Sequence, residues 1–327
     1  MNTSPVSLGS FPTPVEPAPR LAAALGLGPE DLWIKRDDLT GLGGGGNKIR
    51  KLEWTAGAAL AEGADTLVTT GAPQSNHARL TAAAAARLGL AAVLVLRGEP
   101  GAARSGNLAL DGLFGARIAW AGEVGQAGLD AAADDVCARL RAEGARPALI
   151  PFGGSGVRGA RGYVRCGEEL DEQLPELRTV VVALGSGGTM AGLVAALGAG
   201  AVLGVDVGAL ADPAAAVAAF AAPLTARQVT AEELRVRRDQ VGDGYATLTG
   251  PAAEALRLAA RTEGLVLDPV YTGRALAGLR AAVADGDIRP GEKTVFVHTG
   301  GLPGLFGHAD AVAFAQEGAT EFPRHTG

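Results

Sequence analysis

The chain has 327 residues, of which 47% are hydrophobic and 20% are charged, and its formal net charge at pH 7 is −6. This balance predicts a globular protein with room for two packed units rather than a disordered chain. The net charge is negative and no basic block occurs, so a nucleic-acid partner has no electrostatic support and is not expected. The two cysteines, Cys137 and Cys166, are isolated, so we expect neither a disulfide framework nor a metal site.

The sequence also gives no sign of a membrane or export segment. Residues 1–19 lack a basic stretch followed by an apolar core, so no secretory signal is expected. No apolar run reaches membrane-spanning length without a charge or a glycine, and the alanine-rich residues 81–86 are bounded by Arg79 and Arg87. We therefore expect a cytoplasmic protein with no membrane partner.

Short apolar strand candidates alternate with longer helical patterns along most of the chain. The predicted strands are residues 66–70, 91–96, 117–120, 148–151, 179–184, 202–207, 265–267 and 294–298. The predicted helices are residues 78–88, 105–114, 127–143, 158–173, 190–197, 252–263 and 273–284, and the alanine-rich residues 209–222 are compatible with another. Strands that alternate with helices indicate an α/β fold of two units, with open parallel sheets and helices on both faces.

The most informative segment is a run of four glycines, residues 43–46, that leads directly into Asn47 and Lys48. Glycine permits backbone conformations and close approaches that a Cβ atom would block. Lysine is the side chain that forms a Schiff base with an aldehyde cofactor, provided that its amine is deprotonated. The segment is therefore either a plain loop or the turn that presents a catalytic lysine.

A second glycine-rich turn, residues 185–189, lies between a predicted strand and a predicted helix. The free amides and the positive dipole of such a helix start suit a phosphate, although a tight turn without a ligand has the same pattern. A dinucleotide-binding fingerprint is excluded because Met190 stands where its last glycine is required. A P-loop is excluded because Asn47, not glycine, precedes Lys48 and Ile49 follows it.

Further polar residues follow predicted strands, at the edge where open α/β sheets bind ligands. Ser75 and Asn76 open a predicted helix, where they can cap it or help to bind a carboxylate. We expect His77 to be a partly exposed histidine rather than a catalytic base. Tyr271 can pack as a structural ring or act as an acid or base over a cofactor. Thr299 can bond a ring nitrogen or cap a turn.

Taken together, these segments resemble the pyridoxal-phosphate enzymes of the tryptophan-synthase-β-like fold (fold type II). Within that fold they look like the D-cysteine desulfhydrase and 1-aminocyclopropane-1-carboxylate deaminase family. The resemblance rests on residues 35–38, 46–53, 74–77, 185–189, 268–273 and 298–301. These motifs run in family order and span most of the chain, and six ordered motifs are a specific signal where one alone is not.

The resemblance implies pyridoxal 5'-phosphate as the cofactor. The implied cofactor-binding residues are Lys48, Lys51, Asn76, Gly185, Ser186, Gly187, Gly188, Thr189 and Thr299. The implied substrate-binding residues are Ser75, Asn76, His77 and Tyr271, and the implied catalytic residues are Lys48, Ser75, Tyr245 and Tyr271. Lys48 would carry the cofactor as a Schiff base, Lys51 would lie near its phosphate, and Thr299 would face the pyridine nitrogen.

The branch of the family depends on the residue after Tyr271. Deaminases that open the cyclopropane ring carry glutamate there, whereas this chain has Thr272, as in the D-cysteine desulfhydrase-like branch. The implied reaction is the α,β-elimination of D-cysteine to pyruvate, ammonia and hydrogen sulfide. An L-cysteate sulfo-lyase and a 1-aminocyclopropane-1-carboxylate deaminase are the alternatives, because the segment around Tyr245 only partly matches the family's Gly-Tyr-Gly.

Two hypotheses do not make the protein an enzyme. It could be a phosphate- or nucleotide-binding module without catalysis, or a structural or interaction protein such as an inactive paralogue. The first explains residues 185–189 but not Lys48 beside Asn47. The resemblance further implies a large cofactor-binding domain of residues 1–51 and 162–327, a small domain of residues 52–161, and a homodimer. The substrate would be a small amino acid.

Overall fold

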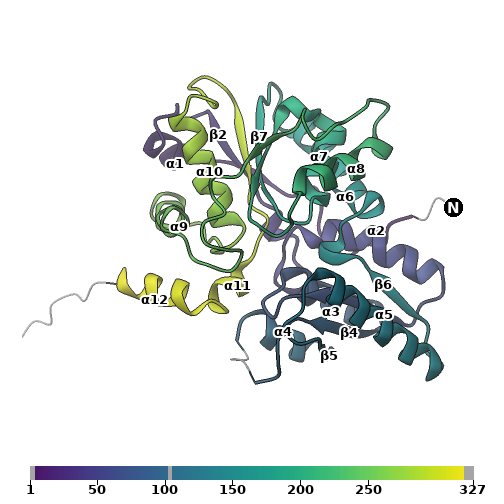
Figure 1. Cartoon of the computed structure of the whole chain (residues 1–327). Helices are drawn as coiled ribbons and strands as arrows, with labels where there is room; N and C mark the ends of the chain where they lie inside the picture. The colour runs from purple at the N-terminus through teal and green to yellow at the C-terminus, as the bar shows by residue number, and fades with distance from the viewer. Residues whose placement is uncertain (1–3, 102–104, 320–327) are drawn as a thin grey trace, which may run out of the picture.

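The computed structural model describes residues 4–101 and 105–319, which form two α/β bodies, each built on its own sheet (Figure 1). The first sheet has the strand order β1-β2-β10-β7-β8-β9. Its strands are β1 (Val15–Pro17), β2 (Leu32–Lys35), β7 (Thr179–Leu184), β8 (Val202–Asp206), β9 (Arg235–Arg237) and β10 (Thr294–Val297). The second sheet has the order β5-β4-β3-β6. Its strands are β3 (Thr66–Gly71), β4 (Ala91–Leu96), β5 (Arg117–Trp120) and β6 (Pro147–Ile150).

Helices cover both faces of the first sheet, because successive residues of a strand point to opposite faces. Val181 packs in the core with α1 (Pro19–Ala24), α9 (Gly250–Glu263) and α10 (Thr272–Ala284). Its neighbour Val180 packs on the opposite face with α6 (Val157–Gln173), α7 (Gly188–Leu197) and α8 (Pro213–Ala221). The last helices, α11 (Leu302–Phe306) and α12 (Ala309–Glu317), follow β10.

The second sheet is covered in the same way. One face packs against α2 (Lys48–Ala61), α3 (Asn76–Leu88) and α4 (Asn107–Leu113), and the other against α5 (Gln126–Ala142). Strands β4, β7, β8 and β10 are nearly continuous apolar runs, as expected for strands that are buried on both faces, and β3 is fully buried although three of its residues are threonines. The two-unit α/β architecture predicted from the sequence is therefore confirmed.

Most predicted elements agree with the structure to within three residues at each end, but two features differ. Residues 265–267 were expected to form a strand and are instead irregular, because they pair with no other strand. Strand β1 pairs antiparallel with β2, so the first sheet is not wholly parallel. This short strand lies at the sheet edge, where the missing amide of Pro17 is tolerated. The proposed domain limits at residues 51 and 161 fall inside α2 and α6 and stay a prediction.

The fold brings three strand ends together. Strands β3, β7 and β10 end at the turns that carry residues 71–77, 185–187 and 298–301. These turns meet the start of α2 where the two bodies adjoin, and the side chains that line the resulting cleft come from both bodies. The carboxyl edge of both sheets is therefore the place to look for a site.

Candidate active site

The glycine run before Lys48 is a turn that only glycine can form. Gly45 and Gly46 have φ angles of +71° and +126°, in the region that disfavours other residues. A Cβ atom on Gly45 would lie 1.9 Å from the carbonyl oxygen of Asp38. The Asn47 amide donates to the Thr299 carbonyl at 3.0 Å. This close approach fixes the first turn of α2, and with it Lys48, against the end of β10.

The Lys48 amine is prepared for nucleophilic chemistry. Burial lowers its pKa to about 8, although the neighbouring Lys51 amine opposes part of that shift. A larger fraction of the amine is therefore neutral near physiological pH than for an exposed lysine. Neutral lysine is the form that attacks an aldehyde.

Lys51 lies one turn further along α2 and is 1% exposed. Its Nζ donates to Ser155 Oγ at 3.0 Å and to the Gly153 carbonyl at 3.4 Å. Burial and the adjacent Lys48 hold the pKa of Lys51 well below its ordinary value. Within the described chain no carboxylate forms an ion pair with either lysine. The pair therefore forms a buried cationic site without an anion of its own.

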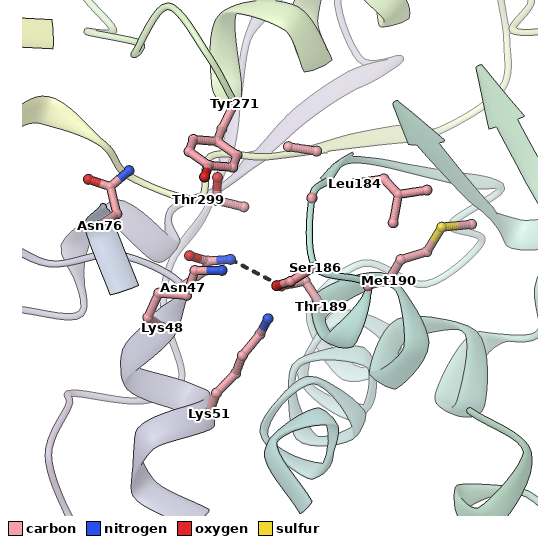
Figure 2. A pocket seen from close by; sticks show the side chains of 13 residues that line it. Asn47, Lys48, Lys51, Asn76, Leu184, Ser186, Thr189, Met190, Tyr271 and Thr299 are labelled. Carbon is pink, nitrogen blue, oxygen red and sulfur yellow. Dashed lines mark hydrogen bonds between the residues drawn. The ribbon is translucent and has the colours of Figure 1, made fainter. Parts of the chain in front are cut away.

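The turn after β7 faces the same two lysines. Figure 2 shows Lys51 pointing from α2 toward Ser186 and Thr189, with Tyr271 and Thr299 on the other side of Lys48. Gly187 is the N-terminal cap of α7 with φ +87°, and it offers no capping side chain. In residues 4–101 and 105–319 the amides of Ser186, Gly187 and Thr189 have no acceptor. They are the free donors of a helix start, which suit an anion.

Ser155 closes this turn from behind. Its hydroxyl accepts from the Gly188 amide at 3.2 Å and bonds Ser186 Oγ at 2.7 Å. A Cβ atom on Gly188 would lie 2.7 Å from Ser155 Oγ, so glycine is required there. Asn47 supports the turn from the side of α2, because its side-chain amide donates from Nδ2 to Thr189 Oγ1 at 3.0 Å (Figure 2). These bonds hold the turn in shape, and within the described chain its remaining amides stay without an acceptor.

The residues after β3 supply a second helix start. Ser75 caps α3, because its hydroxyl accepts from the Ala78 amide at 3.1 Å. Asn76 accepts from the Asn107 side chain at 3.0 Å. His77 is 3% exposed and its Nε2 bonds Thr69 Oγ1 at 2.9 Å, so the expectation of a partly exposed histidine is wrong. Burial, with the charges of Lys48 and Lys51, holds the pKa of His77 well below its ordinary value.

Two tyrosines form the wall opposite α3. The hydroxyls of Tyr245 and Tyr271 are hydrogen-bonded, and their rings meet edge to face with centroids 5.9 Å apart. Burial raises the pKa of both phenols, so both stay protonated and can donate. Asp268 fixes Tyr271 because its carboxylate accepts from the amides of Val270, Tyr271 and Thr272 at 2.8–3.0 Å. The Thr272 hydroxyl also donates to Asp268, at 2.7 Å.

These groups line two adjoining spaces. The first, about 20 Å³, is the cleft between Lys48, Lys51 and the Ser186 turn, into which both lysine side chains extend. The second, about 130 Å³, has Ser75, His77 and Tyr245 in its wall. The two meet at Lys48, Ser186 and Tyr271. The structure thus brings together every site residue expected from the sequence except Gly188, which lies behind the turn against Ser155.

Three residues of the site were not anticipated from the sequence. They are Asn47, Ser155 and Arg97. Ser155 closes a Phe-Gly-Gly-Ser run that begins two residues after the end of β6, a strand-end signal of the same kind as the other turns. Arg97 is the first residue after β4, so it lies at the same edge of the second sheet. Reading all strand ends together would have found both.

The donors fit a phosphate ester that carries an aldehyde. The free amides at the start of α7 and the cationic Lys51 match the phosphate, and the Lys48 amine matches the aldehyde. Thr299 and Asn76 line the same cleft and offer polar groups to a ring between them. Among the described residues no cluster of three or more potential metal ligands occurs. None of the helices in that part of the chain has the length and apolarity to cross a bilayer.

Comparison with known proteins supports a cofactor of this kind. Residues 6–300 match the family described as pyridoxal-phosphate dependent enzyme. A Klebsiella pneumoniae protein named D-cysteine desulfhydrase is 42% identical over 320 residues, covering 91% of this chain and 94% of its own length. A Pyrococcus abyssi protein, provisionally named a 1-aminocyclopropane-1-carboxylate deaminase, is 41% identical over 321 residues, covering 93% of this chain and 94% of its own length.

A solved structure described as an ACC deaminase homologue superposes with a TM-score of 0.87 at 37% identity, covering 96% of this chain and 97% of that one. The matched region contains both bodies and the whole cleft. The chain therefore belongs to the pyridoxal-phosphate dependent enzymes, in the family that includes the ACC deaminase homologue and D-cysteine desulfhydrase.

Proposed function

We propose that this enzyme is a D-cysteine desulfhydrase, which converts D-cysteine and water to pyruvate, ammonia and hydrogen sulfide. The observation that carries the choice of substrate is the residue after Tyr271. Thr272 is fully buried, and its hydroxyl is engaged by Asp268 rather than directed to the cleft. Deaminases of the resembling family carry glutamate at this position, and this chain has no carboxylate there. A relative named as a desulfhydrase is 42% identical to this chain and one provisionally named as a deaminase is 41% identical, so the choice rests on residue 272.

Each protein group has a task in this proposal. When bound, pyridoxal phosphate withdraws electrons from the α-carbon of the substrate. The Lys48 amine, with its pKa near 8, accepts the α-proton. The start of α3, where the amides of Asn76 and His77 have no acceptor in the described chain, binds the substrate carboxylate. Neutral His77 keeps Thr69 and the end of β3 in place.

The tyrosine pair completes the site on the far side. Tyr245 and Tyr271 stay protonated, so they donate hydrogen bonds near the β-carbon without acting as bases at neutral pH. Asp268 holds the Tyr271 backbone through three amides before any substrate arrives. Because the backbone that carries the Tyr271 ring is already fixed, little further conformational entropy is lost when the substrate binds.

The first experiment removes the amine. We expect Lys48→Ala to lose the visible absorbance of the cofactor bond and to form no pyruvate from D-cysteine. Lys293→Ala is the matched control, because Lys293 lies on the surface and pairs with Glu176. It should keep both the absorbance and the pyruvate. Normal turnover by Lys48→Ala would rule out the lysine assignment.

The competing substrates are separated by their products. L-cysteate would release sulfite, and 1-aminocyclopropane-1-carboxylate would release ammonia and 2-oxobutanoate without a sulfur product. The provisional name of the Pyrococcus relative favours the second of these, and Thr272 argues against it. Purified enzyme should give sulfide and pyruvate from D-cysteine. Sulfite from L-cysteate with no sulfide from D-cysteine would reassign the substrate. A homodimer and a cytoplasmic location stay predictions, and sedimentation would test the first.

A further inference from the structure

One charged residue of the 130 Å³ cavity has no task in the chemistry described so far. Arg97 follows β4, and its backbone amide donates to the Gly71 carbonyl at 3.0 Å, which ties it to the turn that leads to Ser75. Its side chain lines the cavity that also contains Lys48 and Tyr245. In the described part of the chain the buried Nε has no hydrogen-bond partner, and no carboxylate forms an ion pair with the guanidinium.

The charge balance of the cavity points to an anion beside Arg97. Among the described residues, its walls contain the cations Lys48 and Arg97 and the neutral His77, and no aspartate or glutamate. Glu99 and Glu123 lie on the adjoining turns, but both are exposed and neither pairs with Arg97. A substrate carboxylate at the start of α3 uses one set of donors. Arg97 is not among those donors. A guanidinium that lines a cavity without a partner can bind an anion there.

A helix start lies in the same wall. Helix α5 has 17 residues and begins at Gln126, which lines the cavity together with Leu129. Its N-terminal cap, Gly125, offers no side chain, and its first turn contains no acidic residue. Across the described residues the amides of Gln126, Ala127 and Gly128 have no acceptor. The positive end of this helix dipole therefore adds to the charge of Arg97.

The field of Arg97 already acts on the interior of the cavity. Burial raises the pKa of Tyr245, and the charge of Arg97 is one of the influences that oppose this rise. Arg97 and Tyr245 also line the same cavity, so the guanidinium is on the side of Tyr245, one of the two tyrosines that we place beside the β-carbon of the substrate. Arg97, the start of α5, Tyr245 and Lys48 therefore line one and the same cavity.

We propose that Arg97 and the first turn of α5 form a leaving-group subsite, which receives the β-substituent of the substrate as a sulfur anion. The proposal rests on the lyase function above. As Lys48 takes the α-proton, the electron pair of the Cα–H bond forms the Cα–Cβ double bond, and the Cβ–S bond breaks with its pair on sulfur. Hydrosulfide leaves from cysteine, and sulfite would leave from cysteate. Arg97 stabilises that negative charge, and no proton donor is needed at this step.

The kinetic test compares leaving groups that need different amounts of stabilisation. Arg97→Met should lower kcat/KM for D-cysteine by about 100-fold, within the range for loss of one preorganised electrostatic contact. It should lower kcat/KM for β-chloro-D-alanine less than about 5-fold, because chloride departs readily without help. Arg97→Lys should recover part of the loss. Arg117→Met is the surface control, since Arg117 is exposed at the start of β5. Equal losses on the two substrates would overturn the subsite.

A binding test is independent of turnover. 3-Sulfopropionate carries a carboxylate and a β-sulfonate but no amine, so it cannot react with the cofactor. Calorimetry should show that the wild-type holoenzyme binds it at least about 10-fold more tightly than butyrate, and that Arg97→Met abolishes the difference, as expected for one lost charge-assisted contact. Equal binding by wild type and Arg97→Met would overturn the subsite.

The two proposals can fail separately. Pyruvate from D-cysteine with no effect of Arg97→Met on either test would keep the lyase function and remove the subsite. Arg97-dependent binding of 3-sulfopropionate by an enzyme that makes no pyruvate from D-cysteine would keep the subsite and remove the desulfhydrase assignment.

Discussion

Two buried arginine–aspartate pairs flank the glycine turn that presents Lys48, and they differ sharply. In the first pair, Arg50 donates to both carboxylate oxygens of Asp37 at 2.9 Å and to Glu169 at 2.7 Å. Thr13 and Tyr163 also donate to Asp37. In the second pair, Arg79 makes one hydrogen bond, to the Gly45 carbonyl at 2.9 Å, and within the described chain neither carboxylate oxygen of Asp111 has a partner.

The pKa shifts of the two pairs have opposite signs. Burial would raise the pKa of Asp37, but Arg50 holds it below the ordinary value, and burial would lower the pKa of Arg50, but Asp37 and Glu169 raise it. For the second pair burial prevails. It raises the pKa of Asp111 to about 7 and lowers that of Arg79 to about 10. The same two residue types therefore stabilise one side of the turn and strain the other, and the number of hydrogen bonds decides which.

The largest expected effect comes from breaking the satisfied pair. Arg50→Met should lower the free energy of unfolding by about 3–5 kcal/mol, because the fully buried Asp37 would lose its cationic partner and Glu169 would keep only Lys35. Urea unfolding at pH 7 measures the change. Arg146→Met is the control, since the Arg146–Asp65 pair is exposed to solvent and should contribute little to stability. A similar small loss for both variants would contradict the comparison.

The next effect is a pH dependence of stability that Asp111 imposes. Its pKa rises from 3.8 unfolded to about 7 folded, so the folded state binds the extra proton between these values. Stability should therefore fall as pH rises from about 4 to 7, by about 4 kcal/mol from this group alone. Asp111→Asn should remove that component and be the more stable protein at pH 8. Unfolding curves for both proteins at pH 4.5 and pH 8 measure it, and parallel pH profiles would disprove it.

The smallest effect isolates the single bond of the second pair. Arg79→Lys keeps the charge but loses the guanidinium bond to the Gly45 carbonyl. We expect a loss of about 1 kcal/mol in unfolding free energy, and weaker retention of the cofactor because the turn before Lys48 loosens. Dialysis of the holoenzyme, followed by absorbance, measures the retention. If Arg79→Lys destabilises the protein as much as Arg50→Met, the two sides of the turn do not differ as described.

The sequence predicted the elements whose signal is local. Strands 91–96, 117–120 and 179–184 are apolar runs bounded by turns, and the structure has them at those residues. The glycine turns before Lys48 and after β7 were identified because only a backbone without Cβ fits them. These features follow from a few neighbouring residues, so one sequence is enough to find them.

The features that were missed depend on distant partners. Strand β2 is short and runs into the charged residues 35–38, so it lacks a clean apolar pattern. Its lysine, Lys35, can be buried because its Nζ donates hydrogen bonds to the side chains of Glu169 and Gln173 on α6, both at 2.7 Å. His77 is buried because a strand threonine, Thr69, supplies its bond. Such pairings join residues up to 138 positions apart, and no local pattern encodes them.

The cap that Asp268 provides also has an evolutionary consequence. Its carboxylate is held at 2.7 Å by the Thr272 hydroxyl, which in turn accepts from the Asp268 amide at 2.8 Å. Glutamate in place of Thr272 would remove both bonds and bring a second carboxylate beside the first, where like charges repel. Replacement of Thr272 alone by glutamate would therefore disturb the turn that carries Tyr271. Folding thus restricts which residues position 272 can accept, whatever the substrate of the enzyme.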